Sequence, residues 1–304
     1  MGRELKGVVT LALAFVLAVT PIGCGDSGRE EVTFPDPTLE ETIRLAIGKP
    51  EGIIYSADLN KLSGSLGSPW SEGLLGKRER ITSLAGLEHC THLTSLWFEG
   101  NQITDLSPIS KLTRLTALGL GRNEISDISP LRNLTNLTEL YLEVNRISDI
   151  TPLSDLTRLT RLALQVNQIS DTTPLSNLTS LTFLSLNGNE ISDISSLSGL
   201  TSLTDLWLSD NRISDITPLS NLTRLTTLTL GGNEISDVTH LVNLTYLIYL
   251  HLHSNQISNI GPLVANLGLS LGDEIDLRDN PLSTQSLNVY VPQLEARGVR
   301  VILS

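Results

Sequence analysis

Residues 203–221 read LTDLWLSDNRISDITPLSN, and this stretch contains the pattern that decides the fold. Asn211 lies near its centre, and Ile213 follows two places later. Self-similarity at a fixed period is the sequence signature of a repeat architecture, and here the period is 22 residues without a slip. The asparagine recurs, each time with isoleucine two places on, as Asn101, Asn123, Asn145, Asn167, Asn189, Asn211, Asn233 and Asn255.

The leucines of this stretch alternate with other residues, as in a strand that is buried on one face. Leu206 and Leu208 should point to one side of the strand and Trp207 to the other. One short strand per repeat predicts a parallel sheet in which each coil buries its leucines against the next coil. The asparagine follows each strand in a turn, where its amide can satisfy backbone groups of its own and the adjacent coil. We therefore expect a structural asparagine ladder.

The other half of each repeat carries recurrent prolines and aspartates. Proline lacks the N–H that a continuous α-helix needs, so these segments are predicted to be short 3₁₀ or extended turns. An aspartate directly before such a turn can accept backbone N–H bonds, and we favour this capping role over calcium binding. The prolines are Pro108, Pro130, Pro152, Pro174, Pro218 and Pro262, and the aspartates are Asp105, Asp127, Asp149, Asp171, Asp193, Asp215 and Asp237.

The repeated unit LxxLxLxxNxIxDxxPLxxLxx resembles the leucine-rich repeat, in its 22-residue internalin-like class, over about residues 71–298. The resemblance implies an α/β solenoid, a right-handed arc with a concave parallel sheet, a convex side of 3₁₀ or extended segments, and helical caps. It also implies a bacterial surface protein that binds other molecules. Internalins generally continue into an immunoglobulin-like domain and an anchor, which we do not expect after the last strand here, so their host-receptor role is not carried over.

Both ends of the repeat array should be covered, since a solenoid otherwise exposes its terminal leucines to water. Asp36 and Pro37 should start a helix that Gly48 ends, and a second short helix is expected from Ser56 to Leu62. Towards the other end, a helix closed by Gly298 should precede a last strand at residues 299–303. The predicted divisions are a signal peptide at 1–23, a flexible spacer at 24–32, a helical N-terminal cap at 33–70, leucine-rich repeats at 71–282 and a C-terminal cap at 283–304.

The first 23 residues have the features of a secretory signal. Arg3 and Lys6 precede an apolar run of about 14 residues, which is too short to span a membrane as a helix. The sequence PIGC at 21–24 resembles a bacterial lipobox, although Pro21 stands where leucine is usual. We expect Cys24 to be lipidated and to anchor the protein in the cell envelope, at the periplasmic or the outer surface. The alternative is cleavage nearby and secretion.

A formal net charge of −12 argues against nucleic acid as a partner, because no segment supplies the clustered basic face that a polyanion needs. The outward column between the two strand leucines holds Trp97, Tyr141 and Trp207, although folding gains nothing from leaving aromatic rings in water. At about 4.8 Å per strand, the two tryptophans should lie about 24 Å apart. An extended protein or peptide of basic character suits this acidic, aromatic surface, and a saccharide stacked on the rings is the alternative.

Trp and Tyr dominate binding hot spots, so the aromatic and charged residues of these columns are candidate contact residues. The competing interpretation is that the rings only pack on neighbouring side chains and stiffen the sheet. The candidates are Trp97, Glu99, Tyr141, Glu143, Phe183, Asp205, Trp207, Tyr249, His251 and His253.

The leading hypothesis is a non-enzymatic recognition module, such as an adhesin or an envelope scaffold, that needs no cofactor. In a second hypothesis His251, His253 and Asp276 make the metal site of an enzyme, since the histidines share a face and Asp276 should lie one strand away. A third is a phosphatase-regulatory leucine-rich protein, which shares the 22-residue period but is disfavoured by the signal peptide. Cys90 occupies a leucine position and is expected to be buried and inert.

Overall fold

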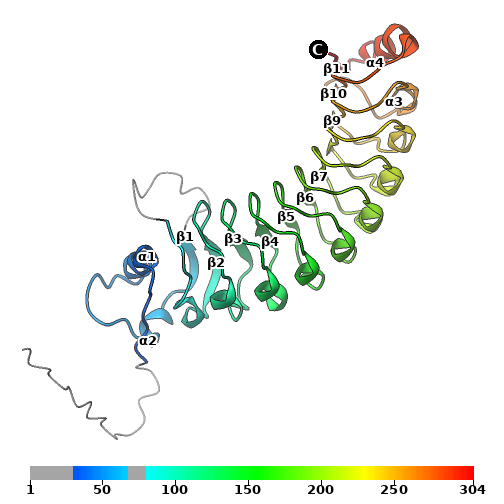
Figure 1. Cartoon of the computed structure of the whole chain (residues 1–304). Helices are drawn as coiled ribbons and strands as arrows, with labels where there is room; N and C mark the ends of the chain where they lie inside the picture. The colour runs from blue at the N-terminus through cyan, green and yellow to red at the C-terminus, as the bar shows by residue number, and fades with distance from the viewer. Residues whose placement is uncertain (1–29, 68–79) are drawn as a thin grey trace, which may run out of the picture.

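The protein forms a curved solenoid whose inner side is lined by one parallel sheet (Figure 1). The structure, a computed structural model, describes residues 30–67 and 80–304. Over these residues eleven strands pair in the order of the sequence, which confirms the predicted leucine-rich-repeat solenoid. The strands are β1 Gly64–Gly67, β2 Leu93–Trp97, β3 Ala117–Gly119, β4 Glu139–Tyr141, β5 Arg161–Ala163, β6 Phe183–Ser185, β7 Asp205–Trp207, β8 Thr227–Thr229, β9 Tyr249–His251, β10 Glu274–Asp276 and β11 Arg300–Ile302.

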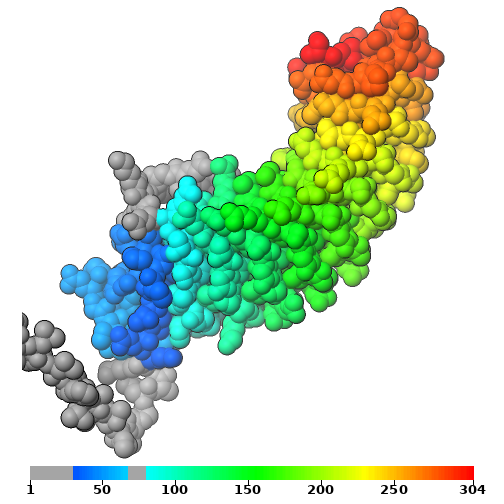
Figure 2. All heavy atoms as spheres, in the orientation of Figure 1, coloured from blue at the N-terminus to red at the C-terminus, as the bar shows by residue number. Residues whose placement is uncertain are grey.

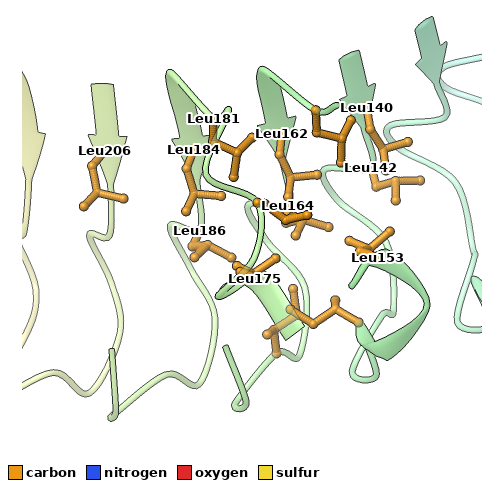
Figure 3. Packing of buried hydrophobic residues seen from close by; sticks show 14 of the residues in the cluster. Leu140, Leu142, Leu153, Leu162, Leu164, Leu175, Leu181, Leu184, Leu186 and Leu206 are labelled. Carbon is orange, nitrogen blue, oxygen red and sulfur yellow. The ribbon is translucent and has the colours of Figure 1, made fainter. Parts of the chain in front are cut away.

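The register of the sheet repeats the period of the sequence. Leu184 lies opposite Leu162 in β5 and opposite Leu206 in β7, so each leucine stacks on its counterpart in the next coil. Successive side chains of a strand point to opposite faces, and all three leucines are fully buried. Figure 3 shows these leucines lying side by side between the strands and the outer segments.

Leucine supplies most of the core of the arc. A buried leucine side chain contributes about 1.5–3 kcal/mol relative to an exposed one, before the entropy of ordering the chain is subtracted. Because each coil contacts mainly its two neighbours, stability is close to a sum over adjacent coils. The space-filling view shows this stack of coils as one continuous body that is hollowed on the side of the sheet (Figure 2).

The asparagine ladder is present as predicted. Asn189 Nδ2 donates to the carbonyl of Leu186 in its own coil at 3.0 Å and to that of Leu164 in the preceding coil at 3.1 Å. Its Oδ1 accepts a hydrogen bond from the backbone N–H of Ile169 at 3.0 Å. One amide therefore pairs backbone groups of two coils that no regular secondary structure satisfies.

The outer side of the arc consists of short 3₁₀ turns, as the prolines predicted. Asp149 Oδ1 accepts the backbone N–H of Thr151 at 2.8 Å, and the aspartates at the same position of the other repeats make the same bond, which confirms their capping role. The turns are Leu87–His89, Ser107–Ile109, Ser129–Asn133, Thr151–Leu153, Thr173–Leu175, Ser195–Gly199, Thr217–Asn221 and Thr239–Leu241, and one α-helical turn, α3 Gly261–Ala265, takes the same place in the next coil.

Helix α1, Pro37–Ile47, covers the N-terminal end of the array with the predicted bounds. Asp36 Oδ1 accepts the backbone N–H of Thr38 and Leu39, whereas its Oδ2 accepts the backbone N–H and hydroxyl of Thr82. Burial alone would raise the pKa of Asp36, but these bonds outweigh it and lower the pKa. The same carboxylate thus starts the helix and fastens it to the first repeat.

The expected second helix is shorter than predicted, and the cap is not wholly helical. Helix α2 spans Ser56–Leu59 and ends before Leu62. Gly64, with φ of 101°, begins strand β1, which pairs in parallel with β2. Pairing with an open sheet edge satisfies backbone groups that a longer helix would have left beside it, so the sheet starts inside the segment expected to be a helical cap.

The C-terminal cap follows the prediction closely. A wide helical turn at Ser286–Tyr290 leads into α4, Val291–Glu295, and Gly298 adopts a φ of 90° before β11. The predicted signal peptide, the lipidation site Cys24 and most of the spacer lie outside the described residues. Within the described part of the chain, no helix is long and apolar enough to cross a membrane.

Candidate functional site on the concave face

The strand register places the predicted outward column on the inner face of the arc. Trp97 pairs with Gly119, Gly119 with Tyr141, and the pairing continues strand by strand to β10. Each member lies one position from an inward leucine, so all of them face away from the core. In order the column is Trp97, Gly119, Tyr141, Ala163, Ser185, Trp207, Thr229, His251 and Asp276.

Two aromatic rings meet over the glycine of β3. The centroids of Trp97 and Tyr141 lie 5.7 Å apart with an interplanar angle of 38°. A Cβ at Gly119 would stand 2.4 Å from Trp97 Cε3, so only glycine leaves room for the tryptophan ring. Both rings remain partly exposed, so they pack sideways on each other and still present surface to solvent.

Two carboxylates approach the same strand. Glu99 Oε1 lies 3.1 Å from the place of a Cβ at Gly119, and Glu143 Oε1 lies 2.3 Å from the place of a Cβ at Gly121. Burial raises the pKa of Glu143, against the opposing effects of its backbone hydrogen bond and the charge of Arg122. Four of the predicted contact residues, two aromatic and two acidic, are therefore brought together over β3 and the turn that follows it.

A chain of polar and aromatic contacts continues from there along the sheet. The Tyr141 hydroxyl donates to Glu139 at 3.1 Å and accepts from Arg161 Nε at 3.2 Å. Burial and the charge of Glu139 raise the pKa of Tyr141, and Arg161 opposes them. The Arg161 guanidinium lies 4.6 Å from the centre of the Phe183 ring, a cation–π arrangement.

Phe183 meets Trp207 edge to face, with centroids 5.3 Å apart. Ser185 Oγ, on the residue that pairs with Trp207 in the register, is buried without a hydrogen-bond partner, and so is Trp207 Nε1. Asp205, also predicted, accepts a hydrogen bond from the Thr204 hydroxyl at 2.7 Å. Phe183 and Trp207 thus form a second aromatic pair, which Arg161 connects to Tyr141 of the first pair.

At the C-terminal end the charges pair with one another. Arg278 donates to both oxygens of Asp276, at 2.9 Å from Nε to Oδ1 and 2.6 Å from Nη2 to Oδ2. Burial would raise the pKa of Asp276, but the hydrogen bonds and charge of Arg278 lower it. Glu274 lies 2.6 Å from Arg300 Nη1 and 3.7 Å from His251 Nε2.

The predicted metal set is not assembled. Asp276 is engaged by Arg278, and His253 instead leans over Gly231, with Nε2 2.2 Å from the place of a Cβ there. Among residues 30–67 and 80–304, no group of three or more His, Cys, Asp or Glu side chains could hold a metal ion. Tyr249, the remaining candidate, is 49% exposed and stands apart from the aromatic clusters. Elsewhere, Cys90 is fully buried, and burial raises the pKa of its thiol to about 12, as expected of an inert residue.

Two features of this face escaped the sequence-based prediction: a pair of unpaired acceptor oxygens and a pair of strained valines. Gln165 Oε1 and Glu143 Oε2 are buried without hydrogen-bond partners, and only the fold shows which side-chain atoms lack partners. Val144 and Val166 adopt left-handed φ values of 54° and 56°, a conformation that is strained for a β-branched residue. The sequence did contain a signal for the valines, because glycine, aspartate or serine fills that position in several other repeats.

A solenoid of stacked 22-residue coils, with leucines inside and an asparagine ladder, defines a leucine-rich repeat protein with an open concave face. The family model for leucine-rich repeats in two copies matches residues 91–133, 113–155, 135–177 and 179–221. Internalin C2 of Listeria monocytogenes is 37% identical over 70% of this chain and 92% of its own, with a TM-score of 0.64. The chain belongs to the internalin-like family of bacterial leucine-rich repeat proteins.

Two further solved structures are similar. The internalin InlF of Listeria monocytogenes is 34% identical over 89% of both chains, with a TM-score of 0.58. The plant peptide hormone receptor RGFR1, solved in complex with RGF2, is 25% identical over 64% of this chain and 37% of its own, with a TM-score of 0.53. None of the curated protein sequences matches the chain.

Proposed function

We propose that the protein is a non-enzymatic binding module whose concave face recognises a polypeptide. The observation that carries the proposal is the pair of aromatic clusters, Trp97 with Tyr141 and Phe183 with Trp207, both on outward positions of one sheet. Large rings at half-exposed positions supply contact area at low entropic cost. The structurally similar plant protein RGFR1 is a peptide hormone receptor, which supports a polypeptide as the ligand class.

The clusters belong to strands β2 to β4 and β6 to β7, so the surface extends across several coils. A ligand that reaches both clusters must be elongated, since parallel strands are spaced by about 4.8 Å each. A saccharide stacked on the rings would use the same residues, and the experiment below separates the two.

The test is to pan a displayed random-peptide library against the folded protein and then to measure the selected peptides by titration. Trp97→Ala and Trp207→Ala are each expected to weaken binding by about 1–3 kcal/mol, the range of a buried aromatic anchor. Tyr246→Ala is the matched control, because Tyr246 is 68% exposed and lies outside the concave columns. Peptides that bind all three variants equally, or a protein that selects only glycans from an array, would exclude the proposal.

We also propose that the protein acts in the cell envelope, tethered through lipid on Cys24, as an adhesin or a scaffold. The support is in the sequence, where a short apolar run ends in PIGC at residues 21–24. Metabolic labelling with an alkynyl fatty acid should mark the wild-type protein and leave Cys24→Ala unmarked. An unlabelled wild-type protein in the culture medium would instead support secretion.

A further inference from the structure

The outward positions of β3 and of the turn after it carry no side chains of their own. Side chains of the adjacent coils occupy the space that this leaves. Gly119 and Gly121 are both buried, because side chains from the two adjacent coils lie over them. Trp97 extends over the first glycine from one side, and Glu143 over the second from the other. Glycine at both outward positions brings an aromatic pair and two carboxylates together at one place on the concave face.

The Glu143 carboxylate is held there with its hydrogen bonds incomplete. Its Oε2 is buried and has no partner, and the same is true of Gln165 Oε1 in the next coil. An ionised carboxylate only accepts hydrogen bonds, and so does the amide oxygen. Leaving such buried acceptors unpaired costs the folded protein free energy, so this position lacks donors rather than acceptors.

The surroundings specify what kind of donor fits. The faces of the Trp97 and Tyr141 rings attract a cation, and Glu99 brings a second carboxylate to Gly119. Arg122 contributes a positive charge near Glu143, yet Oε2 is still without a hydrogen bond. Negative charge, two unpaired acceptor oxygens and aromatic faces together favour a positively charged N–H donor and disfavour an anion.

We propose that Glu143 and Gln165, beside the Trp97–Tyr141 pair, receive a positively charged side chain, lysine or arginine, of the polypeptide ligand. The inference rests on the proposed function, and it names the chemistry that one part of the concave face recognises. Both oxygens are buried, so the two side chains must rotate to meet the incoming ammonium or guanidinium, which then donates to Glu143 Oε2 and Gln165 Oε1. The exposed Val144 and Val166, 40% and 51% accessible, lie next to these residues in sequence and offer apolar surface to the aliphatic stem.

The experiment uses small probes in place of the unidentified ligand. The Trp97 indole resonance, assigned by its loss in Trp97→Phe, is followed by NMR during titration with n-butylammonium, n-butylguanidinium and the neutral 1-pentanol. We expect saturable shifts with the two cations and none with the alcohol. Glu143→Gln should weaken cation binding by at least about tenfold, the value of one charge-assisted contact, whereas Glu234→Gln, which removes the same charge from an exposed position elsewhere, should not.

A second pair of variants displaces the Glu143 carboxylate without changing its charge. Gly121→Ala pushes the Glu143 carboxylate aside, and Gly231→Ala, at the same repeat position, pushes aside His253. Both displace the flexible end of a side chain, so both proteins should stay folded, and only Gly121→Ala should lose the cations. Equal shifts with 1-pentanol, no cation-dependent shift, or equal weakening by the Glu143 and Glu234 variants would each overturn the inference.

The outcomes also separate this inference from the proposed function. If the selected peptides need Trp97 and Trp207 but tolerate Glu143→Gln, the concave face binds polypeptides, and the inference that Glu143 receives a lysine or arginine side chain is wrong. If the cations bind through Glu143 while no peptide is selected, the cation site at Glu143 is supported and the proposed binding of polypeptides is excluded.

Discussion

Two regions of the concave face differ in how their polar side chains are paired. Around β9 to β11 the charges pair internally, Asp276 with Arg278 and Glu274 with Arg300. Around β3 to β5 the acceptors of Glu143 and Gln165 have no partner. The strand register is the same in both regions, although the C-terminal coils also contain α3 and α4, so the comparison concerns the outward residues of the sheet. An end whose polar groups satisfy one another needs no ligand, and an end with unpaired acceptors is suited to bind one.

The comparison first requires that the scaffold be equivalent in both halves. Asn123 and Asn233 each make four hydrogen bonds at matching positions of the ladder. We expect Asn123→Ala and Asn233→Ala each to lower the free energy of unfolding by about 2–4 kcal/mol, because buried backbone groups lose their partners. Denaturant unfolding monitored by circular dichroism measures this. A difference of more than about 1 kcal/mol between the two variants would show that the halves differ in their cores as well.

The pH dependence of cation binding is the next largest effect. Burial raises the pKa of Glu143 above the ordinary glutamate value of 4.5, although the nearby charge of Arg122 opposes this. Of the other groups over β3, Tyr141 stays neutral because its own pKa is raised. Binding of n-butylammonium should therefore weaken by about tenfold per pH unit below the raised pKa. Titrations between neutral and mildly acid pH check this, and an affinity that stays constant down to pH 4.5 would contradict it.

Neutralising one carboxylate in each half should change stability in opposite directions. Glu143 has a raised pKa in the folded protein, so its ionisation costs stability as pH rises through and above 4.5, and Glu143→Gln should be more stable at neutral pH. Asp276 has a lowered pKa, so its contribution is present above about 3.8 and is lost as pH falls further, and Asp276→Asn should be less stable at neutral pH.

Thermal unfolding at neutral pH and again near pH 3 measures both variants. At the lower pH both differences from the wild type should shrink, because both carboxylates are then closer to neutral. Two variants that both lose stability at neutral pH would mean that Glu143 has a stabilising partner within the protein.

The fold could be predicted from the sequence because it depends on a pattern that recurs. Leu206, Asn211 and Asp215 each have equivalents in the other repeats, and a periodic core leaves few arrangements that bury every leucine. The cap was harder, since β1 depends on an open sheet edge that the sequence does not reveal. For the site, the sequence predicted which residues point outward along the sheet, but not which of them contact one another. The meeting of Trp97 with Tyr141 depends on the missing Cβ of Gly119, a contact between three coils that no single repeat shows.

The smallest expected effect concerns the turn after each strand. Val166 has a left-handed φ of 56° and is 51% exposed, whereas Gly232, at the same position three repeats on, has a φ of 66°. The left-handed region costs a β-branched residue about 1–2 kcal/mol and costs glycine almost nothing. Part of this gain is offset by the greater freedom of glycine in the unfolded chain.

We therefore expect Val166→Gly to raise the free energy of unfolding by about 0.5–1 kcal/mol and Gly232→Val to lower it by a similar amount or slightly more. Denaturant unfolding of both variants at one pH measures the pair. Because the exposed Val166 side chain is part of the apolar surface proposed for the aliphatic stem of the ligand, Val166→Gly should also weaken the selected peptides. A Val166→Gly protein that is more stable and binds unchanged would separate the strained valines from the ligand surface and confine that surface to the aromatic rings and Glu143.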